Sequence, residues 1–115
     1  PKEFYPKDIK NYKNVSFTQS ISRAVEASDL VSTDVWVSMG DESEADERQK
    51  LFSDYQVNEE VLDHAKSNVV FLHCLPAIRG QEISYNLLED PRSYVWKQAE
   101  NRLHAQKGLL VELLN

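Results

Sequence analysis

Three short polar segments of this sequence hold residues whose types could do chemistry. The first, HCLPAIRG at 73–80, contains Cys74, the only cysteine in the chain. The second, DVWVSMG at 34–40, begins with Asp34, and the third, AENRLH at 99–104, contains Arg102. A thiol can contact or attack a substrate, a carboxylate can bind an ammonium group, and a guanidinium can stabilise a negatively charged oxygen. These residues are the first candidates for a functional site.

Cys74 has two interpretations, and residue type alone leaves both open. It is either a small buried residue at the end of a core strand or a functional thiol. Pro76 pushes the residue before it towards an extended conformation, and a cis bond between Leu75 and Pro76 would mark a tight turn. A loop of this composition is rigid and bent, and it can direct backbone groups at a ligand.

Asp34 and Arg102 also have competing interpretations. We predict a buried strand over residues 31–37, which places the Asp34 carboxylate among apolar side chains. A buried carboxylate is costly unless it is paired, so Asp34 either has a structural partner or awaits a cationic ligand. Arg102 lies beside Glu100 on a predicted helix, where a surface salt bridge is the simpler interpretation.

Other chemistries lack their motifs. His73 and Cys74 are neighbours on a predicted strand, so their side chains are expected on opposite faces, which disfavours a shared metal ion. The acidic run 41–47 lacks the ligand spacing of a calcium loop and is interpreted as solvated. The sequence has no GxSxG nucleophile elbow and no GxxxxGK or GxGxxG phosphate loop, so nucleotide binding is unsupported. These patterns predict no metal site.

Strands and helices alternate along the predicted chain, which is typical of a parallel α/β sheet. The polar stretch 40–56 is predicted to be a long loop. Ala99, Leu103, Leu110 and Leu114 give the last helix one apolar face. The predicted strands are 15–17, 31–37, 69–73 and 93–96. Helices are predicted near 6–13 and over 19–29, 83–89 and 97–114, and Thr18 is expected to cap the one over 19–29. A further helix is predicted to begin after its cap residue Asn58, with Val61, Leu62 and Ala65 as its buried stripe.

Two of the polar segments fall where predicted strands end. In parallel α/β sheets, ligands bind at the carboxyl ends of the strands. Gly40 and Gly80, two of the three glycines, close these segments and allow backbone to approach a ligand. The sequence therefore predicts a binding site at this edge of the sheet.

Composition limits the class of protein. The 115 residues fit one domain, with 41% hydrophobic and 28% charged residues, and the formal net charge of −6 gives no case for nucleic acid or an anionic membrane as partner. We identify no membrane span and no signal peptide. A single cysteine makes no internal disulfide, which suits the reducing cytoplasm. The chain begins at Pro1 without methionine, so we expect a fragment or a processed product.

Four segments, in this order and spacing, resemble the carboxyl-terminal half of the ornithine carbamoyltransferase family: TDVWVSMG, YQVN, HCLPAIRGQEI and AENRLHAQKGLL. The resemblance covers about residues 29–115. It implies that residues 1–115 are an ornithine-binding domain. The fold class implied is α/β, a three-layer Rossmann-like domain with a mostly parallel sheet flanked by helices, incomplete at its N-terminal side. The family transfers a carbamoyl group from carbamoyl phosphate to the δ-amino group of L-ornithine, giving L-citrulline and phosphate, and the resemblance implies that no metal or organic cofactor is needed.

The resemblance also implies roles for individual residues. Asp34 would hold the ornithine amino group, with Ser38 and Met39 closing over the substrate. Cys74 would contact the δ-amino group.

On the carbamoyl phosphate side, the resemblance implies contacts from Cys74, Leu75 and Arg102. The Leu75 backbone would bind the carbamoyl amide, and Arg102 would donate to the carbamoyl oxygen. Cys74 and Arg102 are the residues expected to be catalytic.

The phosphate-binding Ser-Thr-Arg-Thr and HPxQ motifs of the family's amino-terminal half are absent from this sequence. We therefore expect the isolated chain to be inactive, and the full-length protein to be a cytoplasmic homotrimer or larger homo-oligomer. The SMG segment favours ornithine as the acceptor. The alternatives are an enzyme for putrescine or an acylated ornithine, a non-catalytic α/β interaction domain, and a cysteine-dependent enzyme of another class.

Overall fold

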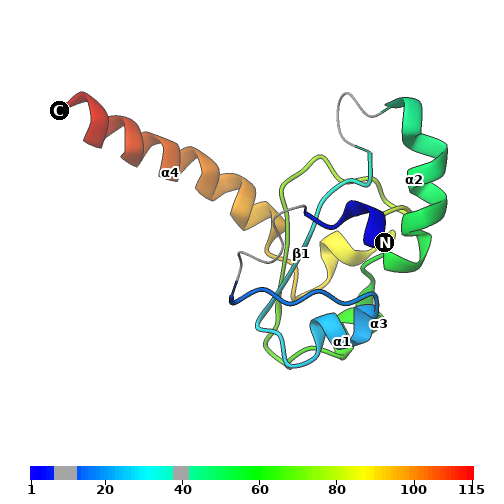
Figure 1. Cartoon of the computed structure of the whole chain (residues 1–115). Helices are drawn as coiled ribbons and strands as arrows, with labels where there is room; N and C mark the ends of the chain where they lie inside the picture. Colours follow the sequence, from blue (N-terminus) through cyan, green and yellow to red (C-terminus); the bar gives the residue numbers. More distant parts are fainter. Residues whose placement is uncertain (7–12, 38–41) are drawn as a thin grey trace.

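The computed structural model describes residues 1–6, 13–37 and 42–115 (Figure 1). Short helical turns surround a small sheet, and one long helix leaves the body of the molecule. In chain order the elements are η1 (Lys2–Phe4), α1 (Ile21–Val25), β1 (Leu30–Thr33), η3 (Glu42–Glu44), α2 (Ala45–Phe52), η4 (Ser53–Tyr55), α3 (Glu59–Asp63), β2 (Val70–His73), η5 (Leu87–Glu89) and α4 (Val95–Leu114).

The sheet of the described residues consists of two parallel strands. β1 and β2 pair in register from Leu30 opposite Val70 to Thr33 opposite His73. The connection between them passes through α2 and α3, as a parallel pair requires. The prediction of a parallel α/β arrangement is confirmed, and both strands end at the same edge.

The predicted strand 93–96 is wrong. Ser93 makes one isolated parallel bridge to Phe71, and Tyr94 donates its backbone N–H to the Phe71 carbonyl at 2.9 Å. The chain then enters α4 at Val95, whose side chain is fully buried. The sequence alone does not distinguish a strand from a helix here, because a short apolar run is compatible with a buried strand and with the buried first turn of a helix.

Other predicted boundaries also change. Residues 15–17 are not a strand, β1 ends at residue 33 rather than 37, and only η5 forms within the predicted helix 83–89. Most of the predicted helix near 6–13 lies outside the described residues. Ser20, not Thr18, caps α1, because its Oγ accepts from the backbone N–H of Arg23 at 3.4 Å.

α2 replaces the long loop predicted over residues 40–56 in the part that the structure describes. The Arg48 guanidinium donates to Glu44 one turn earlier at 3.1 Å, and Phe52 packs its ring 4.8 Å from that of Phe4. Aromatic contacts with a distant segment stabilise this helix, and its own sequence carries little apolar periodicity. A local pattern therefore could not predict it.

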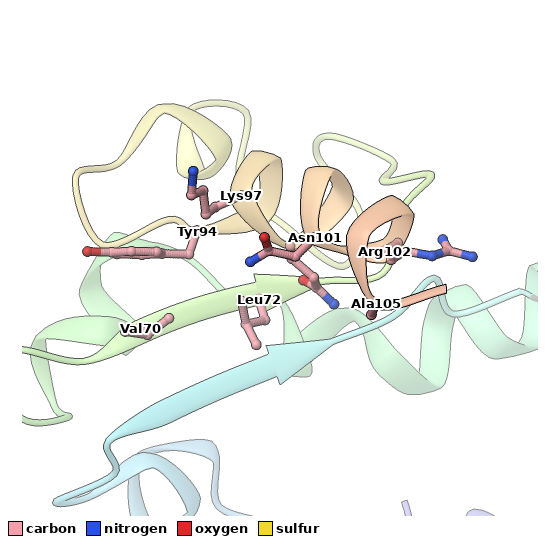
Figure 2. Close-up of a pocket in the computed structure, with 8 residues that line it drawn as sticks. Val70, Leu72, Tyr94, Lys97, Asn101, Arg102 and Ala105 are labelled. Carbon is pink, nitrogen blue, oxygen red and sulfur yellow. The ribbon is translucent and has the colours of Figure 1, made fainter. Parts of the chain in front are cut away.

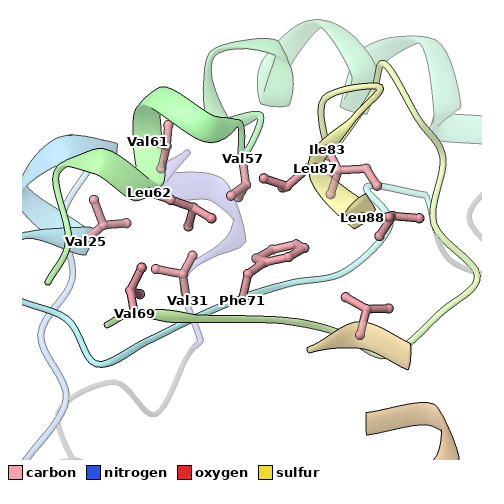
Figure 3. Packing of buried hydrophobic residues seen from close by; sticks show 11 residues of the cluster. Val25, Val31, Val57, Val61, Leu62, Val69, Phe71, Ile83, Leu87 and Leu88 are labelled. Carbon is pink, nitrogen blue, oxygen red and sulfur yellow. The ribbon is translucent and has the colours of Figure 1, made fainter. Parts of the chain in front are cut away.

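The core lies between β2, α3 and the 83–88 segment (Figure 3). Phe71 stands at its centre and is fully buried, which stabilises the fold by about 1.5–3 kcal/mol. Asn58 caps α3 as predicted, with Oδ1 accepting from the N–H of Val61 at 2.8 Å. The core comprises Val25, Val31, Val57, Val61, Leu62, Val69, Phe71, Ile83, Leu87, Leu88 and Val95, with Ala65 packed against it.

α4 projects away from the rest of the molecule after its first turns (Figure 1). Its predicted apolar face is exposed rather than packed: Leu103 is 60% and Leu114 is 81% exposed. Among the described residues, no helix is long and apolar enough to cross a membrane. The helix prediction is confirmed, whereas the expected packing of its apolar face is not.

Candidate functional site

Asp34 and Cys74 meet at the carboxyl edge of the sheet. Each follows the last residue of its strand, and the pairing of Thr33 with His73 brings them together. The Cys74 thiol donates to Asp34 Oδ1 at 3.1 Å across 40 residues of sequence. Asp34 is exposed and lies beyond β1, so its predicted place inside a buried strand is wrong. The carboxylate is available to a ligand.

The hydrogen bond between these two side chains sets their protonation. It lowers the pKa of the Asp34 carboxyl, helped by the Val35 backbone N–H at 2.8 Å, while partial burial opposes the shift. The same hydrogen bond is the main reason why the pKa of the Cys74 thiol is raised above its ordinary value. At neutral pH the pair is a carboxylate and a neutral thiol. Cys74 is therefore a polar contact rather than an activated nucleophile.

The loop after β2 is held in a bent conformation. The Leu75–Pro76 bond, for which the sequence left a cis form open, is cis, and Leu75 has φ 58°. Arg79 donates to both carboxylate oxygens of Glu89 at 2.8 Å, and also to the carbonyl of Tyr85. These contacts connect the loop to η5 and restrain its conformation. Cys74 therefore lies at the start of a restrained loop.

A buried pair beneath this loop was missed by the sequence interpretation. The side chains of His73 and Glu82 are both fully buried, and His73 Nε2 lies 3.1 Å from Glu82 Oε1. The same oxygen accepts the N–H of Ile78 at 2.6 Å, and His73 Nδ1 accepts that of Leu75 at 2.9 Å. The available signal was a glutamate directly before the apolar Ile83. That signal is weak, because most glutamates are exposed.

Arg102 approaches the same edge from α4. Its Nη1 lies 3.5 Å from the Cys74 carbonyl, which replaces the predicted surface salt bridge as its contact. Figure 2 shows Arg102 on the wall of a hollow between β2 and α4. That hollow has a volume of about 410 Å³ and is lined by Val70, Leu72, Tyr94, Lys97, Gln98, Asn101, Arg102 and Ala105.

A second hollow, of about 460 Å³, lies beside Asp34. One carboxylate next to aromatic rings suits a cationic ligand with an aliphatic body. Arg48, paired with Glu44, also lines this hollow. Its aromatic wall consists of Phe4, Tyr5, Phe17, Trp36, Phe52 and Tyr55.

Asp34, His73 and Cys74 each bring one donor atom within 4.8 Å of the others, a spacing that would fit a metal ion. The side-chain separation expected for neighbouring strand residues does not hold, because the chain leaves β2 at His73. Both ring nitrogens of His73 already have partners, in Leu75 and Glu82. A metal would have to displace one of them.

The structure brings together four of the predicted site residues: Asp34, Cys74, Leu75 and Arg102. Ser38 and Met39 lie outside the described residues. A parallel α/β domain with polar side chains gathered at the carboxyl edge of its strands defines the class: a ligand-binding α/β domain.

Residues 2–113 match the family described as "Aspartate/ornithine carbamoyltransferase, Asp/Orn binding domain". The chain belongs to this family. The match covers nearly the whole chain and includes every candidate site residue.

Curated relatives and solved structures agree with this family. The chain is 54% identical to the ornithine carbamoyltransferase of Psychrobacter cryohalolentis over 110 residues, covering 95% of this chain and 36% of that protein. Identity with the enzyme of Chromohalobacter salexigens is 60% over 92 residues, covering 80% of this chain and 30% of that protein. The solved ornithine carbamoyltransferase of Thermus thermophilus gives a TM-score of 0.82 at 36% identity, covering 96% of this chain and 36% of that one. The chain thus spans about a third of the length of these relatives.

Proposed function

We propose that residues 1–115 are the ornithine-binding domain of an ornithine carbamoyltransferase, which transfers the carbamoyl group of carbamoyl phosphate to L-ornithine. The observation that carries this proposal is the hydrogen-bonded Asp34–Cys74 pair at the sheet edge, with Arg102 on the Cys74 carbonyl. The relatives named above carry that activity in their names. In this proposal the product is L-citrulline, and no cofactor takes part.

The negative charge of Asp34 suggests how the site would bind the acceptor, ornithine. Asp34 is ionised and exposed, so it can bind the α-ammonium group of ornithine, and the aromatic-lined hollow beside it can receive methylene groups. Ser38 and Met39 would cover the bound substrate and exclude water. The thiol proton of Cys74 is directed at Asp34, which leaves the sulfur lone pairs to accept an N–H of the δ-amino group.

The transfer step needs a neutral δ-amine, so the ornithine ammonium must first lose a proton. The amine nitrogen then bonds to the carbonyl carbon, the carbon–oxygen bond to phosphate breaks, and phosphate leaves with the bonding electrons and takes up the proton that the amine nitrogen loses. Negative charge develops on the carbonyl oxygen, where the Arg102 guanidinium would stabilise it. The Leu75 backbone would orient the carbamoyl amide, and holding both substrates in line makes the step effectively unimolecular.

Binding of L-ornithine to this chain, measured by calorimetry, tests the acceptor role. Asp34→Ala should weaken the affinity at least about tenfold, since a hydrogen bond to a charged group contributes roughly 1.5–3 kcal/mol. The matched control is Asp46→Ala, which removes the same charge from the exposed face of α2. Nα-acetylornithine should bind weakly to the unaltered chain, because it lacks the α-ammonium group. Equal ornithine affinity in the two variants would contradict the assignment of Asp34.

The phosphate-binding motifs of the family are absent from this chain, which spans about a third of the length of its relatives. We propose that the full-length protein works as a cytoplasmic homotrimer or larger homo-oligomer, and that the isolated chain forms no citrulline. Citrulline formation by the purified chain from both substrates would contradict this expectation. An acceptor other than ornithine, such as putrescine, would appear in the same titrations as tighter binding.

A further inference from the structure

Glu82 is a fully buried carboxylate that the proposed reaction does not use. Its Oε1 accepts two hydrogen bonds, and its Oε2 is buried without a hydrogen-bond partner in the part of the chain that the structure describes. An ionised carboxylate in such a place is costly unless its contacts are strong. Glu82 lies directly beneath the loop that follows β2, and it contacts the backbone of that loop at Ile78.

The hydrogen bonds around His73 determine where its proton lies. The Leu75 backbone N–H can only donate, so His73 Nδ1, at 2.9 Å, accepts and carries no proton. A neutral imidazole then has its proton on Nε2, which donates to Glu82 Oε1 at 3.1 Å. Neither ring nitrogen is left for the Cys74 thiol, which donates to Asp34 instead.

The two contacts of Glu82 Oε1 hold the loop at two points. One acts directly on the N–H of Ile78, at 2.6 Å, and the other acts through His73 on the N–H of Leu75. Leu75 has φ 58°, a left-handed conformation that is unfavourable for a non-glycine residue and persists only where its surroundings hold it. Cys74 directly precedes Leu75, so the position of its thiol depends on the same two hydrogen bonds of Glu82.

We infer that Glu82 is a positioning residue: its carboxylate, through the Ile78 N–H and the Nε2–H form of His73, holds Leu75 and Cys74 in place. The effect of Glu82 on catalysis rests on the proposed function. Its effect on the conformation of the loop does not depend on that function. Loss of the carboxylate should free Leu75 and break the contact between Cys74 and Asp34.

The single cysteine makes a direct probe of this hold. In Glu82→Leu, which removes the acceptor, Cys74 should react with the thiol reagent DTNB at least about fivefold faster at neutral pH, because a thiol released from Asp34 ionises more readily. In Glu82→Gln the amide oxygen can accept the same two hydrogen bonds, so the rate should stay within about twofold of the unaltered chain. Unchanged reactivity in a folded Glu82→Leu chain would overturn the inference.

The control for general destabilisation is Leu62→Ala, which opens a cavity in the hydrophobic core where α3 packs. It should lower the melting temperature and leave the Cys74 rate unchanged. An equal rise in the rate in this variant would show loosening of the whole fold, and would also overturn the inference.

A second measurement needs no variant and remains decisive if Glu82→Leu does not fold. Nitrogen-15 NMR of the unaltered chain at neutral pH should show His73 as a neutral ring protonated on Nε2. A ring protonated on Nδ1, or on both nitrogens, would overturn the inference. Ornithine titration separates this outcome from failure of the proposed function, because neither the thiol rate nor the His73 tautomer depends on substrate.

Discussion

At the scale of single residues, the contact between Cys74 and Asp34 decides the character of the site. A cysteine at a strand end is often a buried filler, but this one is exposed and donates to a carboxylate. The hydrogen bond to Asp34, more than the nearby negative charge, raises the pKa of the thiol and keeps it protonated, which opposes a role as nucleophile. Cysteine-dependent chemistry of another class is therefore disfavoured by the geometry.

The protonation of Cys74 gives a pH prediction. The pKa of the Cys74 thiol should lie above that of a free cysteine in the unaltered chain, and Asp34→Ala should lower it towards the free value by removing both the hydrogen bond and the negative charge. The ultraviolet absorbance of the thiolate during an alkaline titration measures the pKa in both chains. Asp46→Ala is the matched control and should leave the titration unchanged. A Cys74 pKa at or below that of free cysteine in the unaltered chain would contradict the assignment.

At the scale of elements, the loop after β2 and helix α4 each contain a glycine, and the two differ in environment. Gly80 has φ +86°, and a Cβ there would lie 2.9 Å from the ring of Tyr85. Gly108 lies within α4 with open space around it. The first glycine is required by the loop, whereas the second only weakens its helix.

Two alanine substitutions should therefore differ in their effects. Gly80→Ala should lower the free energy of unfolding by about 1–2 kcal/mol, because alanine is strained at positive φ. Gly108→Ala should change it by less than about 0.5 kcal/mol, because the later turns of α4 are exposed and contribute little to the stability of the body. Urea titrations of both variants decide the matter. Equal losses of stability would contradict this view of the loop.

At the scale of the whole molecule, only the first turn of α4 contributes buried side chains to the body of the protein. Val95 is fully buried in the first turn, whereas the side chains from residue 99 onwards are exposed. The body of the protein therefore depends on the start of this helix and little on its later turns (Figure 1).

A substitution and a truncation test this division. Val95→Ala should cost about 2 kcal/mol through lost burial and the cavity that remains. Removal of residues 107–115 should change the free energy of unfolding by less than about 0.5 kcal/mol, as is usual for exposed positions. Both are measured by urea unfolding. A large loss on truncation would show that the later turns pack against the body.

Features that depend on neighbouring residues could be predicted from the sequence alone. Asn58 at the start of α3, the parallel alternation of strands and helices, and the place of HCLPAIRG at a strand end all follow from local periodicity and capping chemistry. The resemblance to ornithine carbamoyltransferases also rested on sequence alone, and the family match confirms it. The roles of the individual site residues stay predictions.

Tertiary structure decided the features that join distant residues. The Cys74–Asp34 contact spans 40 positions and the approach of Arg102 to Cys74 spans 28, and no local pattern encodes either. α2 formed where a loop was predicted, because its aromatic contacts come from another segment. Glu82 looked like a surface residue in the sequence, since only the folded chain shows that its carboxylate is buried beneath the loop it holds. Burial and partner geometry are properties of the packed chain, and the free energy of a buried charge depends on both.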